Sequence, residues 1–163
     1  MILINQCNLE LYDPKTNEVQ SKSGLNWGNS KGNTNPGDTY IPIRKSHIKN
    51  HPKLFPPKQV SMDLSTSIGR LQIQNHPVEL VWDDGTRMEA LFEGSQSFRG
   101  TDYPKQISTF QNKNLIGVYI RKRLGLSPTA TVRKADLDAY GRDYISISLL
   151  SDSVYFVDFS VSK

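Results

Sequence analysis

The chain has 163 residues, of which 36% are hydrophobic and 22% charged, and its formal net charge is +4. This length and composition are typical of a folded globular domain and exclude a disordered chain, so we expect residues 1–163 to form a single domain. No apolar run approaches the ~20 residues that a membrane helix requires, and the lone Cys7 excludes an internal disulfide. We therefore expect a cytoplasmic protein without membrane contact, in which Cys7 is a small buried hydrophobic residue.

The charged residues are segregated along the sequence. Five basic residues and no acid lie between positions 39 and 62, and seven basic residues and no acid lie between positions 103 and 134. Seven acids and only three arginines lie between positions 63 and 102. If the two basic segments fold onto one face, they form the electrostatic footprint of a polyanion-binding protein. An ordinary solvated surface is the alternative.

The first half of the chain is predicted to contain short strands and one long polar loop. Asn8–Tyr12 and Thr39–Ile43 have the composition of strands. Val78–Trp82 and Thr86–Phe92 are joined by Asp-Asp-Gly and predict a hairpin, because Asp-Gly supplies the positive φ that a tight turn needs. Residues 21–37, between the first two strands, are rich in Ser, Gly, Asn and Lys. A polar loop of this length in a compact domain usually has a function.

The second half is predicted to add another polar segment, two helices and a C-terminal hairpin. Residues 94–113 form the polar segment. The i, i+4 spacing of apolar residues in Asn114–Leu124 predicts a helix with asparagine at its start, and Lys134–Tyr140 predicts a shorter helix that ends at a glycine. Tyr144–Leu150 and Val154–Val161 alternate in the manner of paired strands. Many short strands with one or two short helices are typical of a mainly β barrel or sandwich.

The two polar segments contain the side chains that read base edges in DNA. Asn and Gln pair with adenine, Arg and Lys with guanine, and Ser or Thr with bases or phosphates. Polar loops are also common on ordinary surfaces, so composition alone leaves both interpretations open. The basic residues at the end of the 114–124 helix have a structural explanation as well, because the helix dipole favours cations there.

No catalytic or metal-binding pattern in the sequence is complete. The His-x-Lys spacing of phospholipase-D-type nucleases occurs at His51, without the following Asp or a second copy. His47 and His51 lack further ligands for zinc, and no phosphate loop or dinucleotide fingerprint is present. We therefore expect no enzymatic activity, metal or cofactor. A compact metal-dependent nuclease assembled from distant residues, and a single-stranded nucleic-acid binder, remain alternatives.

Several ordered strings resemble one known family. They are SGLNWG at 23–28 with YIPI at 40–43, DDG at 83–85, the segment 105–126, and DLDAYGR at 136–142. In the segment 105–126 the matching residues are Lys105, Ile107, Thr109, Asn112, Leu115, Ile116, Gly117, Tyr119, Arg121, Arg123, Leu124, Gly125 and Leu126. Together these strings resemble the C-terminal domain of NgoFVII-type restriction endonucleases over residues 9–159.

The resemblance implies a mainly β, seven-stranded B3-like DNA-binding pseudobarrel with one or two short helices, similar to plant B3 domains and to the recognition domains of EcoRII and BfiI. It implies sequence-specific binding of double-stranded DNA through the major groove, with an early arm at residues 26–44 and a late arm at residues 94–113. The family's nuclease is a separate phospholipase-D-like domain, which we expect to lie outside this chain. The expected partners are double-stranded DNA and that nuclease domain, and the domain alone is expected to be a monomer.

The resemblance and the polar composition together predict two sets of contact residues. The base-reading set is Asn29, Ser30, Lys31, Asn33, Asn35 and Asp38 on the early arm, and Arg99, Asp102, Lys105, Gln106 and Thr109 on the late arm. The phosphate-binding set is Arg44, Lys45, Lys49, Lys113 and Lys122. Arg99 is the leading candidate for guanine recognition, and its alternative role is a surface ion pair with Glu93 or Asp102. Trp27 and Tyr40 are expected to be packing residues that brace the early arm, and an exposed Trp27 is the alternative.

Overall fold

The computed structural model describes residues 6–58, 60–63, 70–73, 76–109 and 112–162. The strands are β1 (Cys7–Glu10), β2 (Ile41–Pro42), β3 (Val60–Asp63), β4 (Arg70–Ile73), β5 (His76–Trp82), β6 (Arg87–Glu93), β7 (Gln96–Phe98), β8 (Thr101–Tyr103), β9 (Gln106–Thr109), β10 (Tyr144–Ser151) and β11 (Val154–Asp158). The helices are the 3₁₀ helix η1 (Gly24–Asn29) and the α-helices α1 (Lys45–Asn50), α2 (Leu115–Leu124) and α3 (Lys134–Tyr140).

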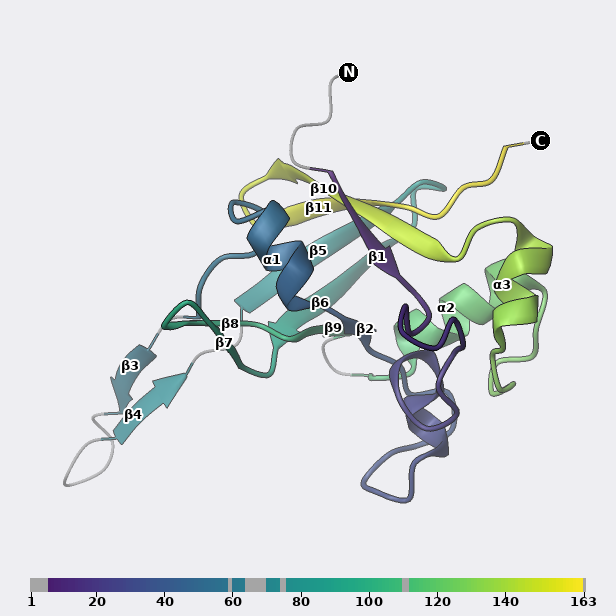
Figure 1. Cartoon of the computed structure of the whole chain (residues 1–163), viewed down its shortest axis with the longest axis horizontal. Coiled ribbons are helices and arrows are strands. Elements are labelled where there is room, and N and C mark those ends of the chain that lie inside the picture. The colour runs from purple at the N-terminus through teal and green to yellow at the C-terminus, as the bar shows by residue number, and fades with distance from the viewer. Residues whose placement is uncertain (1–5, 59, 64–69, 74–75, 110–111, 163) are drawn as a thin grey trace.

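One curled sheet of seven strands forms the body of the protein, in the order β1-β10-β11-β5-β6-β9-β2 (Figure 1). Neighbouring strands are antiparallel except for the parallel pair β11 and β5. The edge strands β1 and β2 lie near one another, so the sheet is nearly closed. Two separate hairpins, β3–β4 and β7–β8, complete the strands of the described residues. The prediction of a mainly β pseudobarrel is confirmed.

Both predicted hairpins are present in the sheet. Gly85 has a φ of 87° in the turn between β5 and β6, as the Asp-Gly signal requires. Ser153 has a φ of 60° in the turn between β10 and β11. The last strand ends at Asp158 rather than at Val161, because the next amide, Phe159 N, donates to the Asp83 carboxylate instead of a strand neighbour.

The helices α2 and α3 begin and end within one residue of the predicted positions, and each ends at a glycine with positive φ. The helix α1 was not predicted, because its six residues are too short to show an apolar period. Its first turn is held by the Arg44 amide, which donates to His47 Nδ1 at 2.9 Å. No helix in the described ranges has the length and apolar character needed to cross a membrane.

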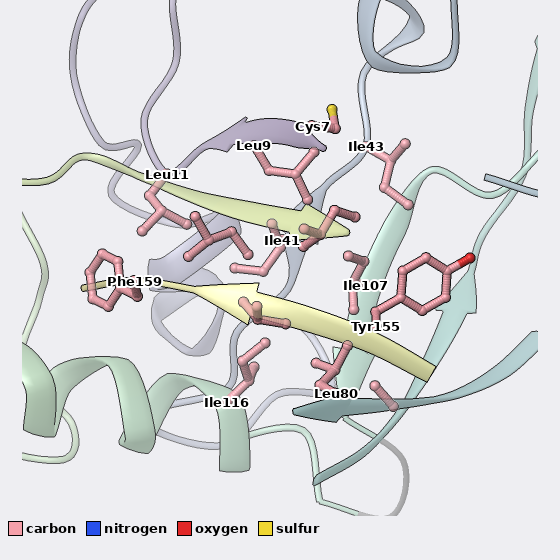
Figure 2. Close-up of a cluster of buried hydrophobic side chains, with 14 of the residues drawn as sticks. Cys7, Leu9, Leu11, Ile41, Ile43, Leu80, Ile107, Ile116, Tyr155 and Phe159 are labelled. Atoms are coloured by element: carbon pink, nitrogen blue, oxygen red, sulfur yellow. The ribbon is translucent and has the colours of Figure 1, made fainter. Parts of the chain in front are cut away.

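The core lies inside the curl of the sheet and is capped by α2 (Figure 2). Leu9, Ile41, Ile107 and Ile116 are each at most 1% exposed. Cys7 is 2% exposed, and burial raises the pKa of its thiol to about 12. Its predicted role as a small buried hydrophobic residue is confirmed.

Candidate nucleic-acid interface

Two polar segments project from the sheet on either side of β2 and β9 (Figure 1). The first is the loop of residues 29–38, which follows η1 and lies at the lower right of the view. We call it the early-arm loop. The second is the β7–β8 hairpin of residues 96–103, at the left, which we call the late-arm hairpin. Part of each long polar segment of the sequence therefore projects, while residues 106–109 of the second segment form strand β9 of the sheet.

The early-arm loop is closed at its neck by close backbone contacts. Gly28 N donates to Asp38 O at 2.9 Å, and an added Cβ on Gly28 would lie 2.5 Å from Asn35 O. Asp38 is only 5% exposed, and its carboxylate accepts from Asn35 N at 2.8 Å. The Asp38 side chain therefore supports the loop from inside, which argues against contact with a base.

A buried arginine of α2 attaches this neck to the rest of the domain. Arg121 is 2% exposed and donates to Leu25 O and Ala130 O, both at 2.7 Å. It also donates to Thr39 Oγ1 at 3.3 Å, so it contacts the chain before and after the loop. Arg121 has no salt bridge within the described ranges, and burial lowers the pKa of its guanidinium.

Asn26 provides a second buried attachment for the early arm. Its side chain is 1% exposed and donates to Gln20 O at 2.9 Å and to Val132 O at 2.8 Å. Its oxygen accepts from Val132 N at 2.8 Å. These bonds join η1 to the segment that precedes α3. The asparagine of the SGLNWG string is therefore structural.

Trp27 and Tyr40 pack at the base of the early-arm loop, as predicted. Their rings lie edge to face, with centroids 5.4 Å apart and an interplanar angle of 76°. Such a pair stabilises a contact beyond its buried area by about 0.5–1.5 kcal/mol. The base of the loop is thus held by an aromatic pair as well as by hydrogen bonds.

The outer part of the early-arm loop carries exposed polar side chains. Lys31, Asn33 and Asn35 are exposed. Asn29 is also exposed, although its amide donates to Ser21 O and Thr131 Oγ1 at 3.1 Å each. Ser30 is half-buried, and its hydroxyl lies 3.2 Å from that of Thr34. The exposed members of the predicted set are available for contact with a ligand.

The late-arm hairpin presents Arg99 at its tip. Phe98 and Thr101 pair across the turn, and the two turn residues, Arg99 and Gly100, have φ values of 53° and 79°. The exposed Arg99 guanidinium lies 5.0 Å from the centroid of the Phe98 ring, a cation–π distance. In the described ranges it forms no ion pair with Glu93 or Asp102, which was the alternative role.

Backbone and side-chain bonds fix the base of the late-arm hairpin. Lys58 N donates to Asp102 O at 2.8 Å and Lys58 Nζ donates to Gly94 O at 2.7 Å. Gln96 Nε2 donates to Ile43 O at 2.6 Å, which links the hairpin to the end of β2. The side chains of Asp102 and Lys105 are exposed. The hairpin is thus tied to the sheet while its tip stays accessible.

A polar cluster lies on the outer face of β6 and β9, next to the late-arm hairpin. Glu93 Oε1 accepts hydrogen bonds from Lys113 Nζ at 2.8 Å, from Gln106 Nε2 at 3.3 Å and from the Ser108 hydroxyl. Burial alone would raise the pKa of Glu93, but the bonds from Lys113 and Ser108 outweigh it and lower the pKa. Thr109, by contrast, is buried, with its hydroxyl donating to Asn112 O, which argues against base contact.

The predicted phosphate-binding residues fall into two groups. Lys45, Lys49 and Lys122 are exposed and form no salt bridge within the ranges that the structure describes. Lys113 pairs with Glu93, and Arg44 donates to Glu10 Oε2 at 3.1 Å and to Tyr12 O at 3.0 Å. Within the described part of the chain, three of the five cations have no carboxylate partner and two have one.

Arg44 closes the gap between the edge strands β1 and β2. His47 Nε2 lies 2.8 Å from the same Glu10 oxygen, and this hydrogen bond is the main cause of the lowered pKa of Glu10. Side chains here replace the missing backbone pairing between β1 and β2. The structure thus uses Arg44 to hold the barrel together, a role that the sequence did not reveal.

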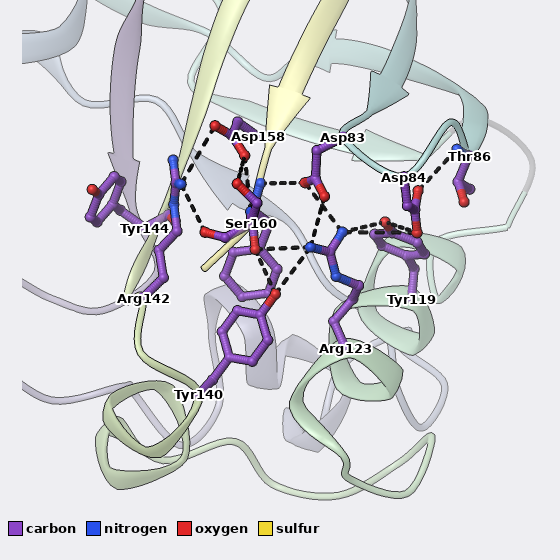
Figure 3. Close-up of polar contacts among 11 residues, drawn as sticks. Asp83, Asp84, Thr86, Tyr119, Arg123, Tyr140, Arg142, Tyr144, Asp158 and Ser160 are labelled. Carbon is purple, nitrogen blue, oxygen red and sulfur yellow. Dashed lines mark hydrogen bonds and ion pairs between the residues drawn. The ribbon is translucent and has the colours of Figure 1, made fainter. Parts of the chain in front are cut away.

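Arg123 joins three parts of the fold through a second network (Figure 3). It donates to both carboxylate oxygens of Asp83, at 3.2 and 2.9 Å, and to Tyr140 Oη and Phe159 O at 3.0 Å each. These bonds raise the pKa of its guanidinium. The DDG and R-x-R strings thus meet in space. Of the three basic residues that end α2, only Lys122 is exposed.

The sequence also left the partners of Arg121 and Glu93 unidentified. Residues two apart on a helix point about 200° apart, so the R-x-R spacing was the signal that Arg121 and Arg123 reach different neighbours. The alternation of inward-facing and outward-facing residues along β6 was the signal that could have placed Glu93 on the outer face. The described ranges hold no group of three or more His, Cys, Asp or Glu residues suited to a metal ion.

The family model described as NgoFVII C-terminal B3-like DNA-binding domain matches residues 4–151. No curated protein matches the chain. The family match spans both projections, the buried neck of the early arm and the β5–β6 turn. This chain therefore belongs to the NgoFVII C-terminal B3-like family and is a DNA-binding domain.

Proposed function

We propose that this domain binds a short, specific sequence of double-stranded DNA by placing the early-arm loop and the late-arm hairpin in the major groove. The family match supports DNA binding. Two projections on either side of β2 and β9 support a grip from both sides. B-DNA offers a distinct donor and acceptor pattern for each base pair in the major groove, which is about 12 Å wide and admits a two-stranded β-ribbon.

The observation that carries this proposal is the presentation of Arg99. An arginine that is exposed at the tip of a two-residue turn, free of a carboxylate partner in the described ranges, has its five N–H donors available. Guanine O6 and N7 accept two of these donors at once, and this is the commonest specific contact in the major groove. The hairpin that carries Arg99 is held to the sheet by hydrogen bonds, and this limits the conformational entropy lost when Arg99 binds.

The proposed base-reading set follows the exposure of the side chains. It comprises Asn29, Ser30, Lys31, Asn33 and Asn35 on the early arm, and Arg99, Asp102, Lys105 and Gln106 on the late arm. The buried Asp38 and Thr109 are left out. The proposed phosphate contacts are Lys45, Lys49 and Lys122, whose ammonium groups are exposed. We propose further that the domain serves as the target-recognition part of a restriction endonuclease whose cutting is done by a separate phospholipase-D-like domain.

Selection from a random duplex library at moderate salt tests the proposal. The expected result is an enriched motif, which binds more tightly than a scrambled duplex and than its own single strands. Arg99→Ala should cost about 1–3 kcal/mol on the selected duplex and relax the base preference at one position. Arg87→Ala is the matched control. Arg87 is exposed on β6, outside both arms, so this substitution removes the same charge from a different part of the surface.

Two results of the binding experiments would overturn the proposal. One is a selection in which no motif is enriched. The other is an Arg99→Ala variant that binds the selected duplex as tightly as the parent does. Incubation with plasmid and Mg²⁺ completes the test, because reproducible cleavage by the purified domain would replace the recognition role with that of a nuclease.

A further inference from the structure

Glu93 occupies an unusual place for an acid in a DNA-binding surface. It is the last residue of β6, is paired in register with Gln106 of β9, and lies three residues before the late-arm hairpin begins. Its side chain is on the outer face and remains 16% exposed. Under the proposed function this position is close to the phosphates and bases that the late arm approaches. A carboxylate there repels a polyanion, so its presence needs an explanation.

The contacts of Glu93 suggest what it does. Lys113, Gln106 and Ser108 all donate to the same oxygen, Oε1. Lys113 Nζ also donates to Ser108 Oγ at 3.1 Å, so the ammonium is held by two neighbours. The Lys113 side chain remains 32% exposed. Two of the three N–H donors of Lys113 are therefore engaged, and a phosphate has to compete with the Glu93 carboxylate for its charge.

A DNA-binding protein gains specificity when it weakens its binding to wrong sequences. Lys and Arg contacts to phosphates bind every sequence alike, and each adds about 0.9 to the slope of log K against log salt. An acid that keeps one lysine from the phosphates lowers this sequence-independent affinity. In the specific complex Glu93 also accepts from Gln106, a proposed base-reading residue, so removing its charge both frees Lys113 and weakens the bond that positions Gln106.

We propose that Glu93 is a specificity-determining residue, which suppresses binding to duplexes of the wrong sequence by holding Lys113 in an internal ion pair. This inference rests on the proposed function of the domain. It also assigns Lys113 a different role from Lys45, Lys49 and Lys122. Lys113 contacts phosphate only when Glu93 is removed.

The test compares Glu93→Gln with the parent on the selected duplex and on a scrambled duplex, over a range of salt concentrations. Glutamine keeps the shape and an acceptor oxygen but removes the charge. The expected result on the scrambled duplex is a rise in affinity of about five- to tenfold near 0.1 M salt, with a slope steeper by about 0.9. Affinity for the selected duplex should change by less than about twofold, because the gain from Lys113 is offset there by the weakened bond to Gln106, so the ratio of the two affinities falls.

Glu89→Gln is the matched control, because Glu89 lies on the same outer face of the same strand and is exposed. It faces Glu79 of β5 and is outside the cluster of Lys113, Gln106 and Ser108. It makes the same change in net charge. A gain of the same size with Glu89→Gln would show that net charge alone is responsible and would overturn the inference.

Lys113→Met completes a double-mutant cycle. In the parent it should change the affinity for the scrambled duplex by less than about twofold. In the Glu93→Gln background it should abolish the rise in affinity that Glu93→Gln produces. A loss of more than about fivefold in the parent, together with a salt slope shallower by about 0.9, would show that Lys113 already contacts phosphate and would overturn the inference. This single variant decides the point even if Glu93→Gln does not fold. Circular dichroism and the thermal midpoint report folding for each variant.

The cycle separates the failure of this inference from the failure of the proposed function. A parent that binds selected and scrambled duplexes equally overturns both. A selective parent whose selectivity is unchanged by Glu93→Gln overturns only the role of Glu93.

Discussion

The two arms are attached to the same sheet in opposite ways. The early-arm loop depends on Arg121, whose bond to Leu25 O joins residues 96 positions apart, and on Asn26, which bonds to Val132 across 106 positions. The late-arm hairpin is built from strands that pair across a two-residue turn, and its base is fixed by bonds from Gln96 and Lys58. The early arm is held by fully buried long-range contacts, whereas the late arm combines a local hairpin with part-buried bonds at its base.

This difference predicts different responses to mutation. Buried donors and acceptors that lose their partners cost about 1–3 kcal/mol each, so damage at the neck of the early arm should affect the whole domain. Damage at the tip of the late arm exposes no buried polar group and should affect binding more than folding. The following changes, in order of expected effect, test this contrast.

Arg121→Met should have the largest effect on stability. It leaves the Ala130 carbonyl without its side-chain donor, and it removes one of the two donors of the buried Leu25 carbonyl, the other being Thr39 Oγ1. We expect the free energy of unfolding to fall by about 3 kcal/mol. Urea denaturation followed by circular dichroism measures the change. Lys122→Met is the control, because this neighbour is exposed and should cost less than about 0.5 kcal/mol. Equal losses in both variants would contradict the anchoring role of Arg121.

The same Gly→Ala change at two positions compares the arms directly. A Cβ on Gly117 of α2 would collide with Thr39 Oγ1 and Gly37 O at the neck of the early arm, and overpacking of this kind costs about 1–3 kcal/mol. A Cβ on Gly100 meets nothing within 4 Å, but its φ of 79° strains any other residue, by about 1 kcal/mol.

Thermal unfolding and DNA binding measure the effects of these two glycine variants. Gly117→Ala should lower the thermal midpoint more than Gly100→Ala does. Gly100→Ala should weaken binding to the selected duplex while its thermal midpoint stays close to that of the parent, because it redirects Arg99 at the hairpin tip. The opposite order of midpoints would show that the late arm is the more deeply anchored of the two.

Glu10→Gln probes the attachment at the end of β2, where the early arm returns to the sheet. The pKa of Glu10 is lowered in the folded protein, mainly by its hydrogen bond to His47. A lowered pKa means that the ionised form stabilises the fold above the unfolded pKa of about 4.3 and that this contribution is lost as the pH falls through the folded value. We expect the variant to lose about 1 kcal/mol at pH 7.

Denaturation at several pH values checks this expectation. The difference between the parent and Glu10→Gln should shrink as the pH falls below about 4, because Glu10 of the parent is then protonated. A difference that stays constant down to acid pH would show that the carboxylate charge does not hold β1 to β2. Glu89→Gln, an exposed acid on β6, is the control for general charge effects.

Local signals predicted the elements whose own residues decide their structure. The hairpin β5–β6 follows from Asp-Gly at its turn, and α3 ends at Gly141, which has a φ of 103°. The helix α1 escaped prediction because six residues cannot show a helical period, and its first turn depends on the His47 ring. The strands β7 and β8 escaped because three residues each show no clear alternation.

The exposed candidates of the interface were likewise accessible from the sequence. Polar composition and the family resemblance drew attention to Lys31 and Asn33 on the early arm and to Arg99 on the late arm, and all three are exposed. The burial of Asp38 and Thr109 was not predictable, because it depends on backbone turns and on neighbours that no local pattern encodes.

The sequence by itself determined the mainly β class, the hairpins β5–β6 and β10–β11, the longer helices and the two polar segments, because each of these depends on residues close together in the chain. Only the tertiary structure decided which cations are free. Arg44, Lys113, Arg121 and Arg123 look alike in sequence, yet they lie against Glu10, Glu93, buried carbonyls and Asp83, respectively. Those partners come from distant strands and loops. The closing of the barrel therefore decides whether each cation is paired with an acid, buried among carbonyls or free to meet a ligand.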